Sequence, residues 1–301
     1  MTMAMMNFTP DQVECPVCGR QRFRAWIATG RGRAVACVGC QLRMTHPRPS
    51  PEELARVYES GDYYESHGMG ENPDAAWRER AKGIVSAAGI QPRTLLDVGA
   101  GEGHLVHAMR ELGIAADGVE LFATGRAAAR ERYGVELRET PPLEASYDLV
   151  TWIHSLEHTR DPVAELRRCR ELLAPSGRLL VEVPHAGSIE MMRPTVRDKI
   201  LDFPVHLFHF VPATLSSVVR AAGFVVERVE LINPEFLERL LALRRPRAAP
   251  GPSVATSGAS PRHAMLYGIP RLRRLWSGHV LPMIRSVAPG YEFTLVAKRG
   301  T

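Results

Sequence analysis

Short apolar runs alternate with helical patterns along the middle of the chain. The run 147–153 is almost continuously apolar, as a strand buried in a parallel sheet should be, and Leu95, Leu96 and Val98 form a shorter run of the same kind. Several helical patterns end at a glycine, which closes a helix without side-chain strain. This alternation predicts an α/β fold. The predicted strands cover residues 94–98, 116–121, 135–138, 147–153, 178–183, 225–232 and 291–297, and the predicted helices cover 51–58, 74–88, 104–112, 124–133 and 161–173.

Breaks in these patterns divide the chain. Residues 44–51 contain three prolines, which exclude a helix or a central strand, so we predict an N-terminal module over 1–48 and a helical cap or linker over 49–90. The core is predicted over 91–233 and 290–301. The insertion 234–289 contains the tract 246–261, which is too poor in large apolar residues to fold alone and predicts a flexible loop. Its segment 263–287 could form a substrate lid, a partner-binding helix or a membrane-surface element, and Pro270 and Pro282 favour short helices forming a lid.

The composition is that of a globular protein with an uneven charge. The 301 residues are 45% hydrophobic and carry a formal net charge of +5. The chain opens without a basic region leading into an apolar run, and no apolar stretch reaches membrane-spanning length, so we expect a soluble, cytoplasmic protein without a transmembrane segment. The basic excess lies in 1–50 and 234–289, whereas 51–233 is acidic. An acidic core is unlike an enzyme whose active face grips a phosphate backbone, so nucleic acid is not the expected partner.

Four of the five cysteines form two pairs. Cys15 and Cys18 enclose two residues, as do Cys37 and Cys40. Two such pairs suit tetrahedral coordination of zinc by four thiolates, and a fully cysteinyl set favours a structural ion. A redox dithiol is the alternative, but it needs a single pair near a βαβ pattern. The fifth cysteine, Cys169, recurs with apolar residues at helical spacing and is predicted to be a small buried hydrophobe.

A glycine-rich turn follows the first core strand. Gly99, Gly101 and Gly103 stand at alternate positions where the backbone must turn sharply and let a ligand approach closely. A dinucleotide-binding turn would need a glycine at the position of His104. Glu120 ends the next strand, where a carboxylate can accept hydrogen bonds from both hydroxyls of a ribose. A surface acid at a strand end is the alternative for Glu120.

Asp97 and the three glycines form the pattern Asp-x-Gly-x-Gly-x-Gly. This pattern resembles motif I of the class I S-adenosylmethionine-dependent methyltransferases. The run 147–162, with its Leu156-Glu157-His158 turn, and the segment 207–215 are similar to a large bacterial methyltransferase-domain family. The resemblance covers roughly 94–232 and 290–298. It departs at His185, where the family often has asparagine.

The resemblance implies an enzyme with a Rossmann-like, seven-stranded sheet, helices on both faces and the additional small zinc module. It suggests that residues 61–65 form a flap over the cofactor, although surface tyrosines packing on neighbouring helices are an equal alternative. The residues that it implies for binding S-adenosylmethionine are Asp97, Gly99, Ala100, Gly101, Gly103, Glu120, Leu121, Trp152 and Ile153.

Three histidines are candidates for acid–base chemistry. Methyl transfer from a sulfonium mainly needs alignment and exclusion of water, and it needs a base only when the acceptor begins protonated. His158 is the first candidate because it follows the carboxyl end of the strand 147–153, where open α/β sheets bind ligands. His206, from a segment that faces the acceptor in the family, is the second, and His154 is the third. A structural histidine is the alternative for each.

The sequence therefore predicts a methyltransferase acting on O, N or C of a metabolite, a sugar or a natural-product intermediate, with a homodimer as one assembly to test. An RNA methyltransferase that binds RNA through the basic zinc module is the first alternative. The Asn/Asp-Pro-Pro-aromatic sequence of known families that methylate base amines is missing after the strand 147–153. The second alternative is a non-catalytic zinc-ribbon interaction protein, which the complete set of Asp97, the three glycines and Glu120 disfavours.

Overall fold

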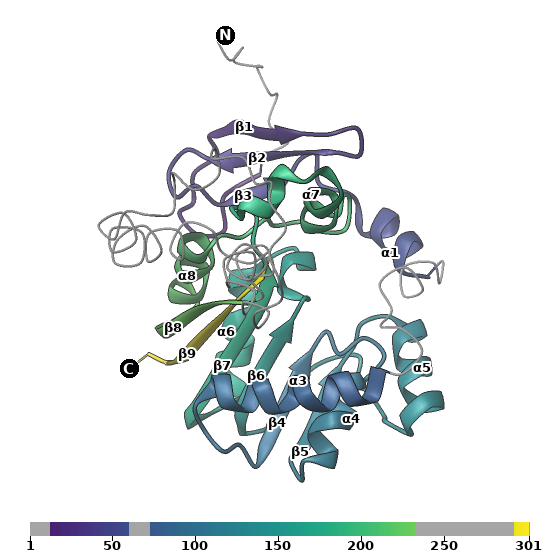
Figure 1. The fold of residues 1–301 in the computed structure, drawn as a ribbon. Helices are drawn as coiled ribbons and strands as arrows, with labels where there is room; N and C mark the ends of the chain where they lie inside the picture. Colours follow the sequence, from purple (N-terminus) through teal and green to yellow (C-terminus); the bar gives the residue numbers. More distant parts are fainter. Residues whose placement is uncertain (1–12, 60–72, 233–291, 301) are drawn as a thin grey trace, which may run out of the picture.

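A six-stranded sheet forms the centre of the computed structural model, which describes residues 13–59, 73–232 and 292–300 (Figure 1). The strand order is β5-β4-β6-β7-β9-β8. The first four of these strands run parallel, whereas β9 is antiparallel to both β7 and β8. The strands are β4 (Thr94–Val98), β5 (Ala115–Val119), β6 (Tyr147–Ile153), β7 (Leu173–Pro184), β8 (Phe224–Ile232) and β9 (Glu292–Arg299).

The predicted fold class, a Rossmann-like α/β sheet, is confirmed. The strand expected at 135–138 is reduced to a single bridge between Val119 and Arg138, so the described part of the sheet has six strands instead of the expected seven. The segment that contains Arg138 lies at the outer edge of the sheet, beyond β5, and among the described strands it pairs only with β5.

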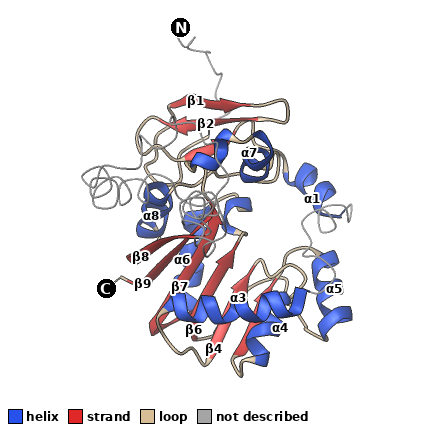
Figure 2. Cartoon of the chain, in the orientation of Figure 1, coloured by secondary structure: helices blue, strands red, loops and turns tan. Residues whose placement is uncertain are grey.

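Neighbouring residues of each strand face two different hydrophobic cores. Leu95 and Leu149 pack in one core, whereas Leu96 and Val150 pack in the other. Successive side chains of a strand point to opposite faces of the sheet, so a continuous apolar run needs cover on both. The first core includes residues of α3 (Pro73–Ala88), α4 (His104–Glu111) and α5 (Ala123–Tyr133), and the second includes residues of α6 (Pro162–Leu172) and α8 (Pro212–Ala221). Figure 2 shows α3 and α4 lying across the near face of the sheet.

Local capping explains where two of the helices begin. In α1 (Pro51–Glu59), the backbone N–H of Glu53 donates to Ser50 Oγ at 3.1 Å, and the N–H of Ser50 donates to Glu53 Oε2 at 2.7 Å. This reciprocal pair satisfies two backbone donors at the helix start. In α6, Asp161 Oδ1 accepts from the N–H groups of Val163 and Ala164. Both starts agree with the sequence predictions.

The N-terminal module is a three-stranded antiparallel sheet of β1 (Phe23–Ala28), β2 (Arg33–Cys37) and β3 (Arg43–Thr45). It lies over the end of the core that carries α7 (Pro194–Leu201) (Figure 1). β3 contacts the segment before α8: the N–H of Thr45 donates to Leu207 O, and the N–H of His209 donates to Arg43 O, each at 3.0 Å. Met44 belongs to the same hydrophobic cluster as residues of the central sheet. The module therefore shares a core with the sheet on which it rests.

The expected flap at 61–65 and the expected loop and lid within 234–289 lie outside the described residues. The predicted division of the chain at 48, 90 and 234 stays a prediction. Among the described residues, no helix combines the length and the apolar character needed to cross a membrane.

Candidate functional site

The glycine turn joins the carboxyl end of β4 to the start of α4. Gly99 has φ 79°, and a Cβ added to it would come within 2.4 Å of the Cβ of Ser155, whose hydroxyl donates to Val98 O at 2.6 Å. Gly101 also has a positive φ of 53°, but a Cβ added there would meet no atom within 4 Å. Gly99 is therefore required by packing against the neighbouring turn. Gly101 instead borders open space, as a residue that faces a ligand would.

Glu120 directly follows β5, and its carboxylate forms a hydrogen bond with the backbone of the glycine turn. Its Oε2 accepts from the N–H of Gly101 and its Oε1 from the N–H of Phe122, each at 2.9 Å. The residue is 6% exposed, and burial raises the pKa of its carboxyl although the two N–H donors oppose the shift. The next residue, Leu121, is 63% exposed. A polar acceptor and an exposed apolar side chain thus lie next to each other beside the turn.

Asp97, the last residue but one of β4, is a buried acid. Its Oδ1 accepts from Thr151 Oγ1 at 2.7 Å, and the residue is 3% exposed. Burial raises the pKa of Asp97 to about 7, the Thr151 hydroxyl opposes this shift, and the charge of Glu120 adds to it. A carboxylate in such surroundings is stabilised by any cation that reaches it.

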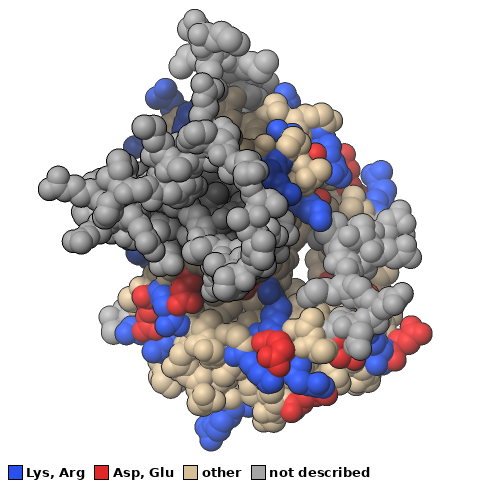
Figure 3. Space-filling view, in the orientation of Figure 1, with Lys and Arg blue, Asp and Glu red and all other residues tan. Residues whose placement is uncertain are grey.

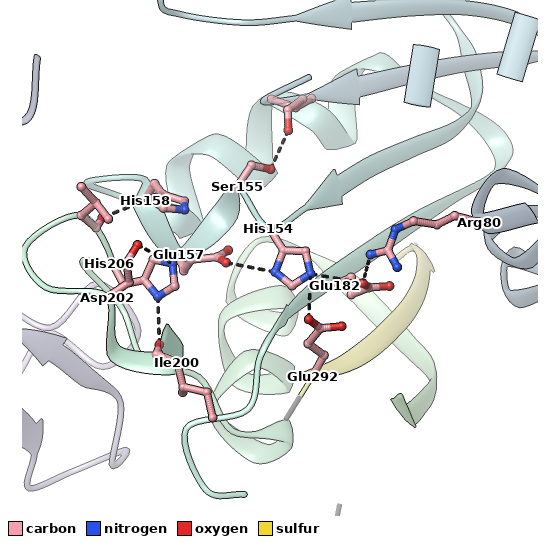
Figure 4. Close-up of polar contacts among 12 residues, drawn as sticks. Arg80, His154, Ser155, Glu157, His158, Glu182, Ile200, Asp202, His206 and Glu292 are labelled. Carbon is pink, nitrogen blue, oxygen red and sulfur yellow. Dashed lines mark hydrogen bonds and ion pairs between the residues drawn. The ribbon is translucent and has the colours of Figure 1, made fainter. Parts of the chain in front are cut away.

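His154, at the carboxyl end of β6, is surrounded by three glutamates from separate elements (Figure 4). Its Nδ1 lies 3.7 Å from Glu157 Oε1, and its Nε2 lies 3.3 Å from Glu182 Oε1 and 3.5 Å from Glu292 Oε1. Burial opposes protonation of this imidazole, but the close contacts with the carboxylates of Glu157 and Glu182 and the charge of Glu292 outweigh it and raise the pKa of His154 to about 10. Arg80 of α3 also pairs with Glu182. With a pKa this high, the imidazole of His154 is protonated at neutral pH.

His158 lies at the end of the short helix η1 (Leu156–His158), next to His206. The two ring centroids are 4.7 Å apart in an edge-to-face arrangement. His158 Nδ1 lies 3.1 Å from Val205 O and 2.7 Å from the hydroxyl of Tyr58 in α1. Burial lowers the pKa of His158 to about 4, and the nearby His206 adds to the effect. The imidazole of His158 is therefore neutral at neutral pH and can accept a proton or bind a metal ion.

The four paired cysteines converge in the N-terminal module. Their sulfur atoms all lie within 4.8 Å of one another, with Cys15 Sγ 3.4 Å from Cys40 Sγ and Cys18 Sγ 3.5 Å from Cys37 Sγ. Four thiolates at about 2.3 Å from one zinc ion would be separated by about 3.8 Å. The arrangement fits a tetrahedral zinc site with small adjustments.

A family model described as a methyltransferase domain matches residues 74–229, which is just over half of the chain. The chain belongs to this methyltransferase-domain family. The family predicted from the glycine turn and the Leu156-Glu157-His158 turn is thereby confirmed. A ubiquinone biosynthesis O-methyltransferase of Pseudomonas paraeruginosa is 30% identical over 113 residues, which are 34% of this chain and 49% of the relative. The chain thus spans about half the length of the curated relatives it matches first.

Solved structures share the fold of this methyltransferase-domain chain. A SAM-dependent methyltransferase from Archaeoglobus fulgidus superposes with a TM-score of 0.55 at 16% identity, covering 81% of this chain and 99% of the other. The 1,6-didemethyltoxoflavin-N1-methyltransferase of Burkholderia thailandensis, solved with 1,6-didemethyltoxoflavin and S-adenosylhomocysteine, gives a TM-score of 0.50 at 17% identity, covering 88% and 98%. At this identity the likeness is one of fold.

The structure brings most of the residues predicted for the site into two groups. The first is the glycine turn with Asp97 and Glu120. The second, the histidine group, consists of His154, His158 and His206 with their polar side-chain neighbours. Trp152 is different, because its indole N–H donates to Cys169 Sγ at 3.3 Å inside the core. Only the main chain of Trp152 is therefore placed to meet a ligand. Ala100 and Ile153 are each 9% exposed.

Four polar residues of the histidine group were missed by sequence reasoning: Tyr58, Arg80, Glu182 and Glu292. Glu182 could have been found, because it interrupts an otherwise apolar strand, and a charge in a buried strand needs a partner. The other three lie far away in sequence, and only the folded chain shows that Tyr58 contacts His158, Glu292 contacts His154 and Arg80 contacts Glu182.

Proposed function

We propose that this chain is an S-adenosylmethionine-dependent methyltransferase that acts on a small molecule. The observation that carries the proposal is the open space at Gly101 next to the carboxylate of Glu120, at the carboxyl ends of two adjacent parallel strands. Open α/β sheets bind ligands at this edge. The relatives named ubiquinone biosynthesis O-methyltransferases agree with the proposal.

The groups around the turn suit each part of the cofactor. Glu120 would accept hydrogen bonds from the ribose hydroxyls. Each carboxylate oxygen has more than one lone pair, so the ribose bonds could form beside the bonds from Gly101 N–H and Phe122 N–H or replace one of them. The exposed Leu121 would pack against the adenine ring. Asp97 would pair with the positively charged methionine end of the cofactor, which would relieve the cost of its buried charge. Gly101 would let that end approach the backbone.

The histidine group would receive the methyl acceptor. It follows β6, and Ser155 of the same turn contacts the glycine turn through Val98 O, so the two groups are adjacent. His154, its three neighbouring glutamates and Arg80, which pairs with Glu182, form a network of ion pairs along one side of this site. His158 supplies a neutral imidazole toward the acceptor. Donor and acceptor would thus be aligned at one edge of the sheet, which is what displacement at a sulfonium methyl requires.

The four cysteines would bind a structural zinc ion. A zinc ion bound by all four cysteines would connect the turn that holds Cys15 and Cys18 to the turn that holds Cys37 and Cys40. It would thereby stabilise β3, which contacts the segment that contains His206. The hydroxyl of Thr45 also donates to His206 O at 2.6 Å. Zinc would therefore act on catalysis only indirectly, by holding one wall of the acceptor site.

RNA stays an alternative acceptor, with the zinc module as its binding surface. On the face drawn in Figure 3, basic and acidic residues of the described part are interspersed, without the continuous basic stripe that follows a phosphate backbone. This distribution favours the small-molecule acceptor.

Two measurements test the proposal. Isothermal titration calorimetry should give one S-adenosylmethionine site per chain, and transfer of a labelled methyl group should occur to metabolite extracts and not to total RNA. Absence of cofactor binding would refute the enzyme and revive the interaction protein. Labelling of RNA alone would refute the small-molecule acceptor.

A further inference from the structure

The carboxylate of Glu157 is buried, and no described residue forms a hydrogen bond with it. The residue is 1% exposed, and neither of its two carboxylate oxygens has a hydrogen-bond partner among the described residues. Its Oε1 lies 3.7 Å from His154 Nδ1, which is an ion-pair distance but too long for a hydrogen bond. A buried carboxylate without direct ligands is costly unless a cation binds it. The position of Glu157 therefore requires an explanation beyond His154.

Two imidazoles stand beside this carboxylate. One possible ligand atom from each of Glu157, His158 and His206 lies within 4.8 Å of the other two. His158 Nδ1 lies 3.1 Å from Val205 O, and His206 Nδ1 lies 2.9 Å from Ile200 O. A carbonyl oxygen only accepts, so Nδ1 of His206 carries the proton and its Nε2 carries a lone pair. In His158 the same tautomer lets Nδ1–H donate to Val205 O, and the Tyr58 hydroxyl, 2.7 Å from this Nδ1, then accepts from the same N–H.

Imidazoles held through Nδ1–H by backbone carbonyls are typical of metal ligands. The carbonyl fixes the orientation of the ring and presents Nε2 to the ion. Here both rings have this support, and Figure 4 shows them beside Glu157. Asp202 Oδ2, 3.9 Å from His206 Nε2, adds negative charge on the same side.

A second group with possible metal ligands differs in its partners. His154, Glu182 and Glu292 also bring ligand atoms within 4.8 Å of one another. The oxygens of Glu182, however, pair with Arg80, Thr294 and His154, so that group is balanced by cations of the protein itself. In Glu157, by contrast, both carboxylate oxygens are buried and neither has a hydrogen-bond partner among the described residues.

We propose that Glu157, His158 and His206 bind a divalent transition-metal ion, separate from the four-cysteine site. Two imidazoles and one carboxylate on one side of an ion leave coordination positions for an oxygen-bearing ligand. The inference rests on the proposed function in one respect, namely that this ligand is the methyl acceptor. The acceptor would then be a hydroxyl compound, and preferably one with two neighbouring oxygens.

In this proposal His158 and His206 act as metal ligands, and the metal ion, by activating the acceptor hydroxyl, makes a general base unnecessary. Coordination lowers the pKa of a hydroxyl, whose proton leaves to solvent. The oxygen then forms the new bond to the methyl carbon, the bond between that carbon and sulfur breaks, and sulfur keeps the electron pair as a neutral thioether. The charge on the acceptor oxygen and the positive charge on sulfur are both lost in this step.

Manganese(II) is the probe for this site, because carboxylate and imidazole ligands bind it whereas thiolate sites favour zinc. The full chain, freed of metal and reloaded with zinc at its cysteines, should bind one further Mn²⁺, measured by loss of the free-ion signal in electron paramagnetic resonance. Glu157→Gln and His206→Ala should each weaken Mn²⁺ binding at least about tenfold. His107→Ala is the matched control, since His107 lies on α4 against Tyr133, and it should bind Mn²⁺ as the parent does.

Calorimetry with S-adenosylmethionine on the same samples reports whether each variant is folded. Retained cofactor binding with lost Mn²⁺ binding supports the proposal. An unmodified chain that binds no Mn²⁺, or a Glu157→Gln chain that binds it with unchanged affinity, overturns it. If His206→Ala does not fold, His158→Gln provides the second test of the ligand set. Mn²⁺ binding without any cofactor binding would instead contradict the proposed function and leave the metal site standing.

Discussion

Replacement of Glu120 by glutamine separates the cofactor role of this residue from its structural role. The side chain accepts one hydrogen bond from Gly101 N–H and one from Phe122 N–H, and it is almost fully buried. Glutamine has the same shape, but its single carbonyl oxygen can replace only one of the two carboxylate oxygens. Its amide nitrogen must then face one of these two backbone donors.

Both consequences can be given magnitudes. Charge-assisted hydrogen bonds are roughly twice as strong as neutral ones, so loss of the charge from two ribose contacts should cost about 2–3 kcal/mol of cofactor binding, or about 30- to 150-fold in Kd. The unmet backbone donor should cost about 1–3 kcal/mol of folding stability. The two effects are measured independently, by calorimetry and by urea unfolding without cofactor.

The decisive comparison uses an S-adenosylmethionine analogue that lacks both ribose hydroxyls. Glu120→Gln should bind the natural cofactor about 30- to 150-fold more weakly than the parent does, but the two proteins should differ little for the analogue. Glu139→Gln is the control, because Glu139 is exposed and pairs only with Arg126 among the described residues. An equal loss of affinity for cofactor and analogue would refute ribose recognition and would show that Glu120 acts only by shaping the turn.

Three further predictions concern the zinc site, the glycine turn and the buried acid. Cys15→Ser should abolish the thiolate-to-cobalt absorption of the cobalt-loaded chain, and a spectrum like that of the parent would contradict the four-cysteine site. Gly101→Ala should cost only about 1–2 kcal/mol of stability, from its positive φ, yet weaken cofactor binding, whereas Gly99→Ala should destabilise far more because its Cβ would overlap Ser155; similar unfolding curves for the two variants would refute this distinction. The pKa of Asp97 is raised from 3.8 to about 7, so the folded chain holds this proton more tightly than the unfolded chain does, and stability without cofactor should rise as pH falls through 7. Between pH 8 and pH 6 the gain attributable to Asp97 should be about 1.4 kcal/mol, measured as the difference from Asp97→Asn in urea unfolding, and equal slopes for the two proteins would contradict it.

Features that depend on neighbouring residues could be predicted from the sequence. The strand, glycine turn and helix around Asp97, the capped starts of α1 and α6, and the convergence of the two cysteine pairs each follow from local geometry. The alternation of strands and helices then leaves few ways to cover an apolar sheet, which is why the fold class was predictable. Helix α7 was missed, because its eight residues have a weak apolar pattern and it is placed by packing near the N-terminal module.

The sequence by itself predicted the turn that we propose holds the cofactor, because a glycine-rich turn leaves its mark in consecutive residues. The charges around the proposed acceptor site were decided only by the tertiary structure. His154 is a candidate base from the sequence, and the carboxylates of Glu157, Glu182 and Glu292, which reach it from η1, β7 and β9, favour its protonated form. The charge state of a side chain depends on which other charges the fold brings within a few ångströms, and residues as distant in sequence as His154, Glu182 and Glu292 carry no local sign of that contact.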